Sequence, residues 1–354
     1  MRILTVNFKK IAYSFFLFLF CTYLTWHLLN FFTKTIYFNS MMIIEKVNIS
    51  WSNFLNFKTV FLSIIIEALP FILIGVLVSA FLQNFVSEEA ISKFLPRNRI
   101  LNILLACFIG VIFPVCECGI VPVARRLVSK GVPLYSAITF MLAAPIINPV
   151  VASSTAVAFS GNHQMVWSRL ELAFFVSFIA GLLISCLYDQ SALRAGMLQN
   201  HCDCGCSHNH HHSGAAFLNK LISAFPIACD EFFDMGKYLI MGAALAAIAQ
   251  IFLSRDILLH IGQDSLSSIA AMMSFAFGVS VCSSADAFIA ASFSANFTAG
   301  SLLAFMVFGP MIDVKNLLML LHAFRARFVV LLVSIVVLLV LAGTYLINYV
   351  TFLE

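Results

Sequence analysis

Long apolar runs alternate with short polar stretches over almost the whole chain. One crossing of a bilayer core about 30 Å thick needs roughly 20 apolar residues in a helix. A helix satisfies its own backbone hydrogen bonds, as lipid demands. The pattern therefore predicts an all-α polytopic membrane protein. The predicted spans lie near residues 11–32, 58–84, 100–128, 132–158, 164–188, 227–253, 266–296, 299–320 and 325–350.

Two of the predicted spans are interrupted near their middles by polar or small residues. The first interruption is Cys-Glu-Cys-Gly at 116–119, bracketed by Pro114 and Pro122, and the second is Cys-Ser-Ser-Ala-Asp at 282–286. Irregular backbone at membrane depth is tolerated only where protein or a polar cavity surrounds it. Each interruption therefore predicts a re-entrant or broken hairpin.

Polar, proline and glycine positions recur along the chain at a nearly constant offset. The matched pairs are Glu67 with Asp234, Gly75 with Gly242, Gln83 with Gln250, Cys116 with Cys282, Pro145 with Pro310, and Asn148 with Asp313. The offset falls from 167 to 165 residues along the chain, as short deletions between helices would produce. The sequence thus predicts two related repeats, at 55–188 and 225–354. An N-terminal helix with its connecting loop precedes them at 1–54, and a loop at 189–224 joins them.

Positive charge predicts how the repeats are oriented, because short cytoplasmic loops collect Lys and Arg. Arg2, Lys9 and Lys10 place the N-terminus in the cytoplasm, and Arg325 and Arg327 fall on the same side. The 189–224 loop is then cytoplasmic as well. Each repeat crosses about three times and adds a hairpin, so the repeats are predicted to be inverted. Inverted repeats with broken helices are typical of secondary transporters.

Composition narrows the class of protein further. Of the 354 residues, 62% are hydrophobic and 10% are charged, with a net charge of +4. Soluble domains carry about a quarter of their residues as charged side chains, so a soluble enzyme is excluded. The small positive charge lies in loops, where it indicates membrane orientation and not a nucleic-acid partner. The predicted partner of most of the surface is the lipid bilayer.

The interruptions and the proline-broken spans bring polar groups to a predicted midplane site. Proline removes a backbone donor and displaces the carbonyl four residues earlier, which leaves that carbonyl free to face a solute. Carboxylates and amides inside a membrane are costly and therefore functional candidates. The predicted solute-binding residues are Cys116, Glu117, Cys118, Pro145, Asn148, Cys282, Asp286, Pro310 and Asp313.

The thiols indicate the kind of solute. Thiolate prefers soft acceptors such as Cu(I), Zn(II) or trivalent metalloids. Cys116 and Cys118 with Cys282 from the other repeat could hold one soft atom. A buried cysteine can equally be a small hydrophobic residue, and we interpret Cys107 and Cys186, like Cys21, in that way.

Glu67 and Asp234 occupy equivalent positions in the first span of each repeat. Desolvation favours the neutral form of a carboxyl group, so both residues are candidates for proton coupling. A buried hydrogen bond is the alternative, as is an ion pair of Asp234 with Lys237 one turn further on.

The loop between the repeats contains three cysteines and five histidines within residues 201–212. With a glycine for flexibility, these side chains could supply four ligands to Zn(II) or another soft transition metal. The irregular spacing indicates a flexible metal store or sensor more than a structural site. No cofactor is predicted to be required. The candidate metal ligands are His201, Cys202, Cys204, Cys206, His208, His210, His211 and His212.

Several strings of residues resemble the predicted permease family that includes the ArsP organoarsenical efflux permeases and the YraQ-type proteins. They are Phe-Pro-Val-Cys-Glu-Cys-Gly-Ile-Val-Pro at 113–122, Gly-Val-Pro at 131–133, Leu-Ala-Ala-Pro-Ile-Ile-Asn-Pro at 142–149, Val-Cys-Ser-Ser-Ala-Asp-Ala-Phe at 281–288 and Phe-Gly-Pro-Met-Ile-Asp at 308–313. The resemblance implies a multi-pass permease of the bacterial plasma (inner) membrane. Some relatives export trivalent organoarsenicals through cysteine thiols, which correspond here to Cys116, Cys118 and Cys282.

Three functions stay open at this point. The first is a permease that moves a soft metalloid or metal ion, outward and by alternating access. The second is a membrane thiol oxidoreductase or metal-insertion factor with Cys116 and Cys118 as its redox pair. It lacks support from any cofactor motif or nucleotide-binding loop in the sequence. The third is a metal-handling subunit that passes metal from residues 201–212 to a membrane or metal-carrying partner protein.

Overall fold

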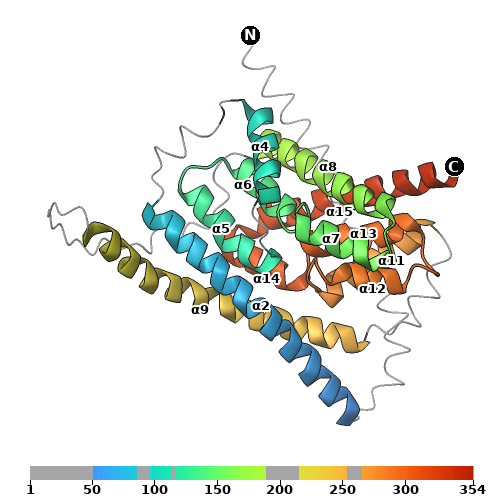
Figure 1. The fold of residues 1–354 in the computed structure, drawn as a ribbon, viewed down its shortest axis with the longest axis horizontal. Helices are drawn as coiled ribbons and strands as arrows, with labels where there is room; N and C mark the ends of the chain where they lie inside the picture. Colours follow the sequence, from blue (N-terminus) through green and yellow to red (C-terminus); the bar gives the residue numbers. More distant parts are fainter. Residues whose placement is uncertain are drawn as a thin grey trace. The chain divides into compact units, whose positions relative to one another are not determined.

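The computed structural model describes residues 51–85, 96, 98–112, 116–188, 215–252 and 265–353, and every regular element among them is an α-helix (Figure 1). The predicted span at 11–32 and the His/Cys-rich stretch at 201–212 lie outside these residues. The chain divides into two compact units, Met1–Leu55 and Asn56–Glu354. Apart from residues 51–55, all the described helical residues belong to the second unit.

The helices form two series in the same order. The first series is α2 (Trp51–Phe85), α4 (Arg99–Ile112), α5 (Glu117–Ser129), α6 (Leu134–Ala143), α7 (Pro149–Ala158) and α8 (His163–Leu187). The second series is α9 (Ala215–Phe252), α11 (Ser265–Val279), α12 (Asp286–Ser292), α13 (Ala299–Met311), α14 (Val314–Ala323) and α15 (Ala326–Leu353). Each series begins and ends with a long helix and has two interrupted helices between them. This order agrees with the predicted repeats, whose inverted orientation stays a prediction.

Five of the described segments are long and apolar enough to cross a membrane, which confirms the polytopic class. They are Phe54–Gln83, His163–Leu187, Ala228–Gln250, Ala299–Ala323 and Ala326–Tyr349. The helices α4, α6, α7 and α11, which are segments of the interrupted spans, are shorter but also apolar.

The predicted breaks are present, and local chemistry explains the two that lie near Pro145 and Pro310. α6 ends at Ala143, and α7 starts at Pro149, whose missing amide hydrogen is harmless in the first turn. The side chain of Asn148 caps α7 by accepting a hydrogen bond from the Val151 amide at 2.9 Å. In the second series, α13 ends one residue after Pro310, and the helix that follows is again capped by a side chain.

The two series pack in equivalent ways and then against each other. α4 contacts α6 and α8 as α11 contacts α13 and α15. Across the series, α6 contacts α13, and α8 contacts α15. The hairpin helices cross over, because α5 packs on α14 while α12 packs on α7. Each hairpin therefore places its tip against the broken helix of the other series.

Two matched glycines mark close helix approaches. A Cβ atom on Gly75 of α2 would lie 2.6 Å from the Cα of Gly119 in α5. A Cβ atom on Gly242 of α9 would lie 2.7 Å from the Cα of Lys315 in α14. Such distances leave no room for a side chain, so the first helix of each series can approach its neighbour only through glycine. At Gly242 this contact encloses the base of the Lys315 side chain.

Candidate functional site

The tips of the two hairpins meet through their cysteines. Cys116 is the residue just before α5, and Cys282 lies in the link between α11 and α12. The two thiol side chains lie close enough to interact with each other. The Cys282 sulfur also lies 3.1 Å from the Ser284 hydroxyl, and it interacts with the Glu67 carboxyl from α2. The structure thus brings together two of the three predicted thiols, one from each repeat.

The third thiol, that of Cys118, is buried in the first turn of α5. It interacts electrostatically with Lys315 and Cys282. In the part of the chain that the structure describes, no group of three His, Cys, Asp or Glu side chains is arranged to hold a metal ion. The described geometry is therefore a two-thiol pair with a third thiol nearby. The predicted metal tract at 201–212 lies outside the described residues.

A buried lysine, which the sequence reasoning missed, lies next to this pair. The Lys315 Nζ is 3.9 Å from Glu117 Oε1 and 3.4 Å from Asp313 Oδ2. The three side chains are 4%, 2% and 1% exposed, respectively. Asp313 also caps α14, because its Oδ1 accepts a hydrogen bond from the Asn316 amide at 2.6 Å. A lysine two residues after a predicted helix break could have been recognised as costly in lipid and hence as a candidate.

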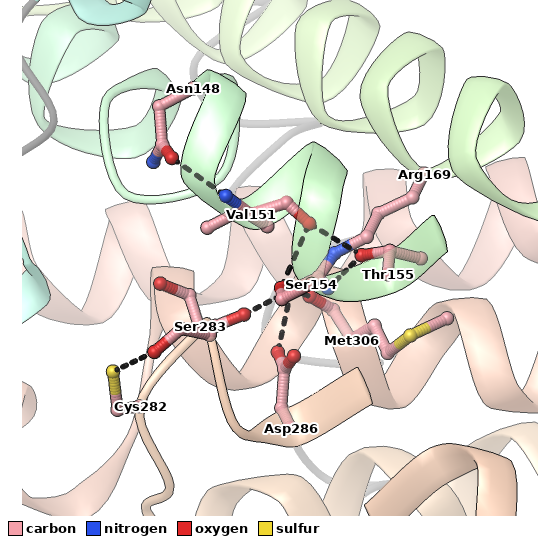
Figure 2. Close-up of polar contacts among 10 residues, drawn as sticks. Asn148, Val151, Ser154, Thr155, Arg169, Cys282, Ser283, Asp286 and Met306 are labelled. Carbon is pink, nitrogen blue, oxygen red and sulfur yellow. Dashed lines mark hydrogen bonds and ion pairs between the residues drawn. The ribbon is translucent and has the colours of Figure 1, made fainter. Parts of the chain in front are cut away.

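Arg169 of α8 is a second buried cation that the sequence reasoning missed, and it binds residues of the other hairpin tip (Figure 2). Its Nη2 donates to Asp286 Oδ2 at 2.7 Å and to the Ser283 carbonyl at 3.1 Å. Its Nη1 donates to the Thr155 hydroxyl at 2.8 Å. Arg169 is 1% exposed and among the largest fully buried side chains. The sequence could have indicated Arg169 as a candidate, because an arginine within the apolar stretch 164–188 is costly in lipid.

The arginine also explains one effect of Pro310. The carbonyl four residues before that proline belongs to Met306, and a proline cannot supply its usual amide donor. The Arg169 Nη2 donates to this carbonyl at 3.0 Å. In the structure, a protein side chain therefore satisfies the carbonyl that we expected to face a solute.

Two of the buried ion pairs connect the repeats crosswise. Glu117 is the first residue of α5 and pairs with Lys315 of the second repeat, whereas Asp286 is the first residue of α12 and pairs with Arg169 of the first. A carboxylate at a helix N-terminus is favoured by the helix dipole. Each hairpin tip thus faces a buried cation from the opposite repeat.

The other predicted site residues have mainly structural contacts. Asn148 uses its Oδ1 as the cap of α7, and its Nδ2 donates to the Ala144 carbonyl at 3.1 Å. Pro145 lies buried within the break between α6 and α7. Asp234 is exposed and pairs with Lys237 at 3.0 Å, which is the alternative that the sequence left open.

A further polar link joins three helices near the hairpin of the first repeat. The Ser79 hydroxyl of α2 donates to Glu231 Oε2 of α9 at 2.8 Å. The same oxygen lies 3.5 Å from Arg126 Nη2 of α5. Glu231 was also missed, although it follows Pro226 inside an apolar helix.

Residues 53–349 match the model of a family described as a predicted permease of the ArsP type. The chain belongs to this predicted permease family. The family that the strings at 113–122 and 281–288 suggested is thereby confirmed, and with it a multi-pass membrane permease.

Two curated relatives match most of this permease. The UPF0718 protein YcgR of Bacillus subtilis is 49% identical over 297 residues, which cover 84% of this chain and 98% of the relative. A Streptococcus mutans protein is 42% identical over 278 residues, covering 78% of this chain and 90% of the relative. That protein bears the provisional name of a two-component membrane permease complex subunit. No solved structure matches the chain.

Proposed function

We propose that this permease exports a soft metalloid, such as a trivalent organoarsenical, or a soft metal ion through a thiol and carboxylate site between its repeats. The observation that carries the proposal is the proximity of the Cys116 and Cys282 side chains, which interact with each other. These thiols come from the two hairpin tips, so one solute atom bound to both would bridge the repeats. Two thiols that converge from separate repeats suit a soft acceptor better than a hard ion.

The two-thiol geometry favours a solute with two exchangeable positions. A monoalkyl arsenical, R–As(OH)2, condenses with two thiols to form two As–S bonds and release two water molecules. Each thiol loses its proton to a departing hydroxyl, so no oxidant or reductant is needed. The nearby Cys118 thiol offers a third sulfur to which the arsenic can transfer by exchange.

Alternating access would use the same bridge. Rocking one repeat against the other changes the separation of the hairpin tips, as in transporters built from repeats. A solute held by Cys116 and Cys282 together is then bound in one arrangement and released in the other, where two water molecules restore the As–OH groups and return one proton to each sulfur. Binding energy from both thiols is available only while the tips are close.

Serine variants test the proposal in membrane vesicles that take up a trivalent monomethyl arsenical. Replacement of Cys116 or Cys282 by Ser substitutes a hard, poorly ionising hydroxyl for a soft ligand of similar size. We expect affinity to fall at least tenfold, equivalent to about 1.4 kcal/mol. Cys107→Ser, in the buried face of α4, and Cys186→Ser, at the exposed end of α8, are the matched controls. Wild-type uptake by both site variants would refute the thiol mechanism.

We also propose that the permease works with a second membrane subunit. The name of the Streptococcus mutans relative, which describes a two-component complex, supports this proposal. The test is affinity purification of the tagged chain from its native membrane, where a single membrane protein should co-purify in a fixed ratio. If vesicles containing the chain alone transport at the full rate, the subunit is unnecessary. If neither preparation transports, a thiol oxidoreductase or metal-handling role becomes the better explanation.

A further inference from the structure

The environment of Lys315 differs from that of an ordinary buried ion pair. Two carboxylates, those of Glu117 and Asp313, face one ammonium group, and all three side chains are almost completely buried. The distances of 3.9 Å and 3.4 Å are longer than those of charge-assisted hydrogen bonds. The lysine is thus shared between two acids and held tightly by neither.

Two buried oxygens of this triad lack a hydrogen bond of normal geometry. They are Oε2 of Glu117 and Oδ2 of Asp313, and the second has the Lys315 ammonium at 3.4 Å as its ion-pair partner. A buried carboxylate oxygen without a donor is costly, and each such oxygen calls for an explanation. A bound proton would explain these oxygens, because a protonated carboxyl oxygen is itself a hydrogen-bond donor and can bond to the neighbouring carboxylate.

The charge of the triad indicates how many protons it takes. One ammonium and two carboxylates leave a net charge of −1 in a buried site. Burying an unpaired charge is unfavourable, so the triad gains by binding one cation. A metal ion would have to approach the positive Lys315, whereas a proton needs no coordination space. One proton makes the triad neutral.

Comparison of the repeats shows that the helix break does not require these charges. The position that matches Asp313 is Asn148, which caps α7 in the same way. The position that matches Lys315 at the same offset is Val150. The first repeat therefore forms its break and cap without an acid or a lysine. The charges of Asp313 and Lys315 in the second repeat are therefore not needed to form the helix break or its cap.

The other cross-repeat pair is built differently. Arg169 makes hydrogen bonds of 2.7 to 3.1 Å to Asp286, Thr155 and Ser283. One arginine there faces one carboxylate, so the pair is already neutral. The Arg169 pair has the geometry of a fixed tie, and the Lys315 triad has that of an exchangeable one.

We propose that Lys315, Glu117 and Asp313 form a proton-binding site that exchanges one proton in each transport cycle. One O–H bond forms on a carboxylate oxygen with a proton taken from water on one side, and that proton is returned on the other. This inference rests on the proposed function only for the identity of the coupled solute. It moves the coupling role from Glu67 and Asp234 to the triad. The titratable groups that face the triad from neighbouring elements are Glu67 of α2, Cys116 and Cys118 at the start of α5, and Cys282 between α11 and α12.

The decisive experiment is infrared difference spectroscopy of the purified full-length protein between alkaline and acidic pH. The wild type should show the carbonyl stretching band of one buried protonated carboxyl. Asp313→Asn and Glu117→Gln should each remove that band, because either change makes the triad neutral without a proton. Asp313→Asn keeps the cap, since asparagine already performs it at position 148. Lys315→Met should instead enlarge the band, because two acids then lack their cation.

Glu231→Gln is the matched control, since it neutralises a buried acid outside the triad and should leave the band intact. A band that persists in both Asp313→Asn and Glu117→Gln overturns the inference. Vesicle uptake of a trivalent monomethyl arsenical then separates the two proposals. If the wild type shows no uptake but the bands behave as described, the proton site stands and the solute assignment fails. If Asp313→Asn still accelerates uptake in response to a pH gradient as the wild type does, the coupling role fails while the thiol site stands.

Discussion

Replacement of Arg169 by methionine tests whether the Arg169–Asp286 pair holds the repeats together. Methionine fills much of the same volume but removes the charge and all the hydrogen bonds of the guanidinium group. Asp286 would be left as a buried carboxylate, 3% exposed, without its partner at 2.7 Å. Breaking a buried ion pair from one side costs about 3–5 kcal/mol. We therefore expect the free energy of unfolding to fall by about that amount, a large part of the stability of a typical domain.

Two further variants separate charge from geometry. Arg169→Lys keeps the charge but lacks the planar fork that reaches Thr155 and the Met306 carbonyl, so it should lose about 1.5–3 kcal/mol. The double variant Arg169→Met with Asp286→Leu removes both charges and should recover most of the loss, because an apolar replacement of a buried pair is often neutral. Unfolding is measured by titration of the detergent-solubilised protein with a denaturing detergent. Equal stability of Arg169→Met and the wild type, or a double variant no more stable than Arg169→Met, would refute the reasoning.

Three other predictions concern the thiols, the loop and the orientation. Oxidation with diamide should link Cys116 to Cys282 by a disulfide, with the oxidant taking up two electrons and two protons, and should stop transport until a reductant is added; an unchanged rate with the crosslink present on gels would contradict this. Deletion of 201–212 should abolish stoichiometric Zn(II) binding measured on the purified protein yet leave part of the transport, so complete loss of transport in a well-folded deletion counts against a separate metal store. Labelling of single introduced cysteines should find the region of Arg325 in the cytoplasm and that of Arg255 outside, and labelling of both from one face would contradict inverted repeats.

The local features of the fold followed from short-range rules that a sequence displays directly. Apolar runs longer than a bilayer crossing indicated the long helices. Pro145 and Pro310 indicated breaks, because proline lacks the amide hydrogen that an uninterrupted helix needs. The recurrence of Cys116 at Cys282 indicated a duplication before any contact was known. These inferences needed only the residues within a helical turn or a constant offset.

The partners of the buried charges could not be predicted in this way. Arg169 lies 117 residues from Asp286, and Lys315 lies far from Glu117 in the chain. Their meeting depends on the crossed packing of α5 on α14 and of α12 on α7. The sequence alone also favoured a three-thiol site, whereas the structure pairs Cys116 with Cys282 and places Cys118 nearby but outside the pair.

By itself, the sequence determined that this protein is an all-helical membrane protein with broken helices and thiols at the breaks, and it predicted two related repeats. Hydrophobic length, proline chemistry and repeat spacing are local properties, so no tertiary information was needed for them. Only the tertiary structure decided which polar residues are satisfied within their own helix and which face groups from other helices. A cap such as Asn148 is satisfied by its own helix, while Lys315 is shared between two acids from different repeats. The difference lies in long-range packing, because the cost of a buried charge depends on what other helices bring to it.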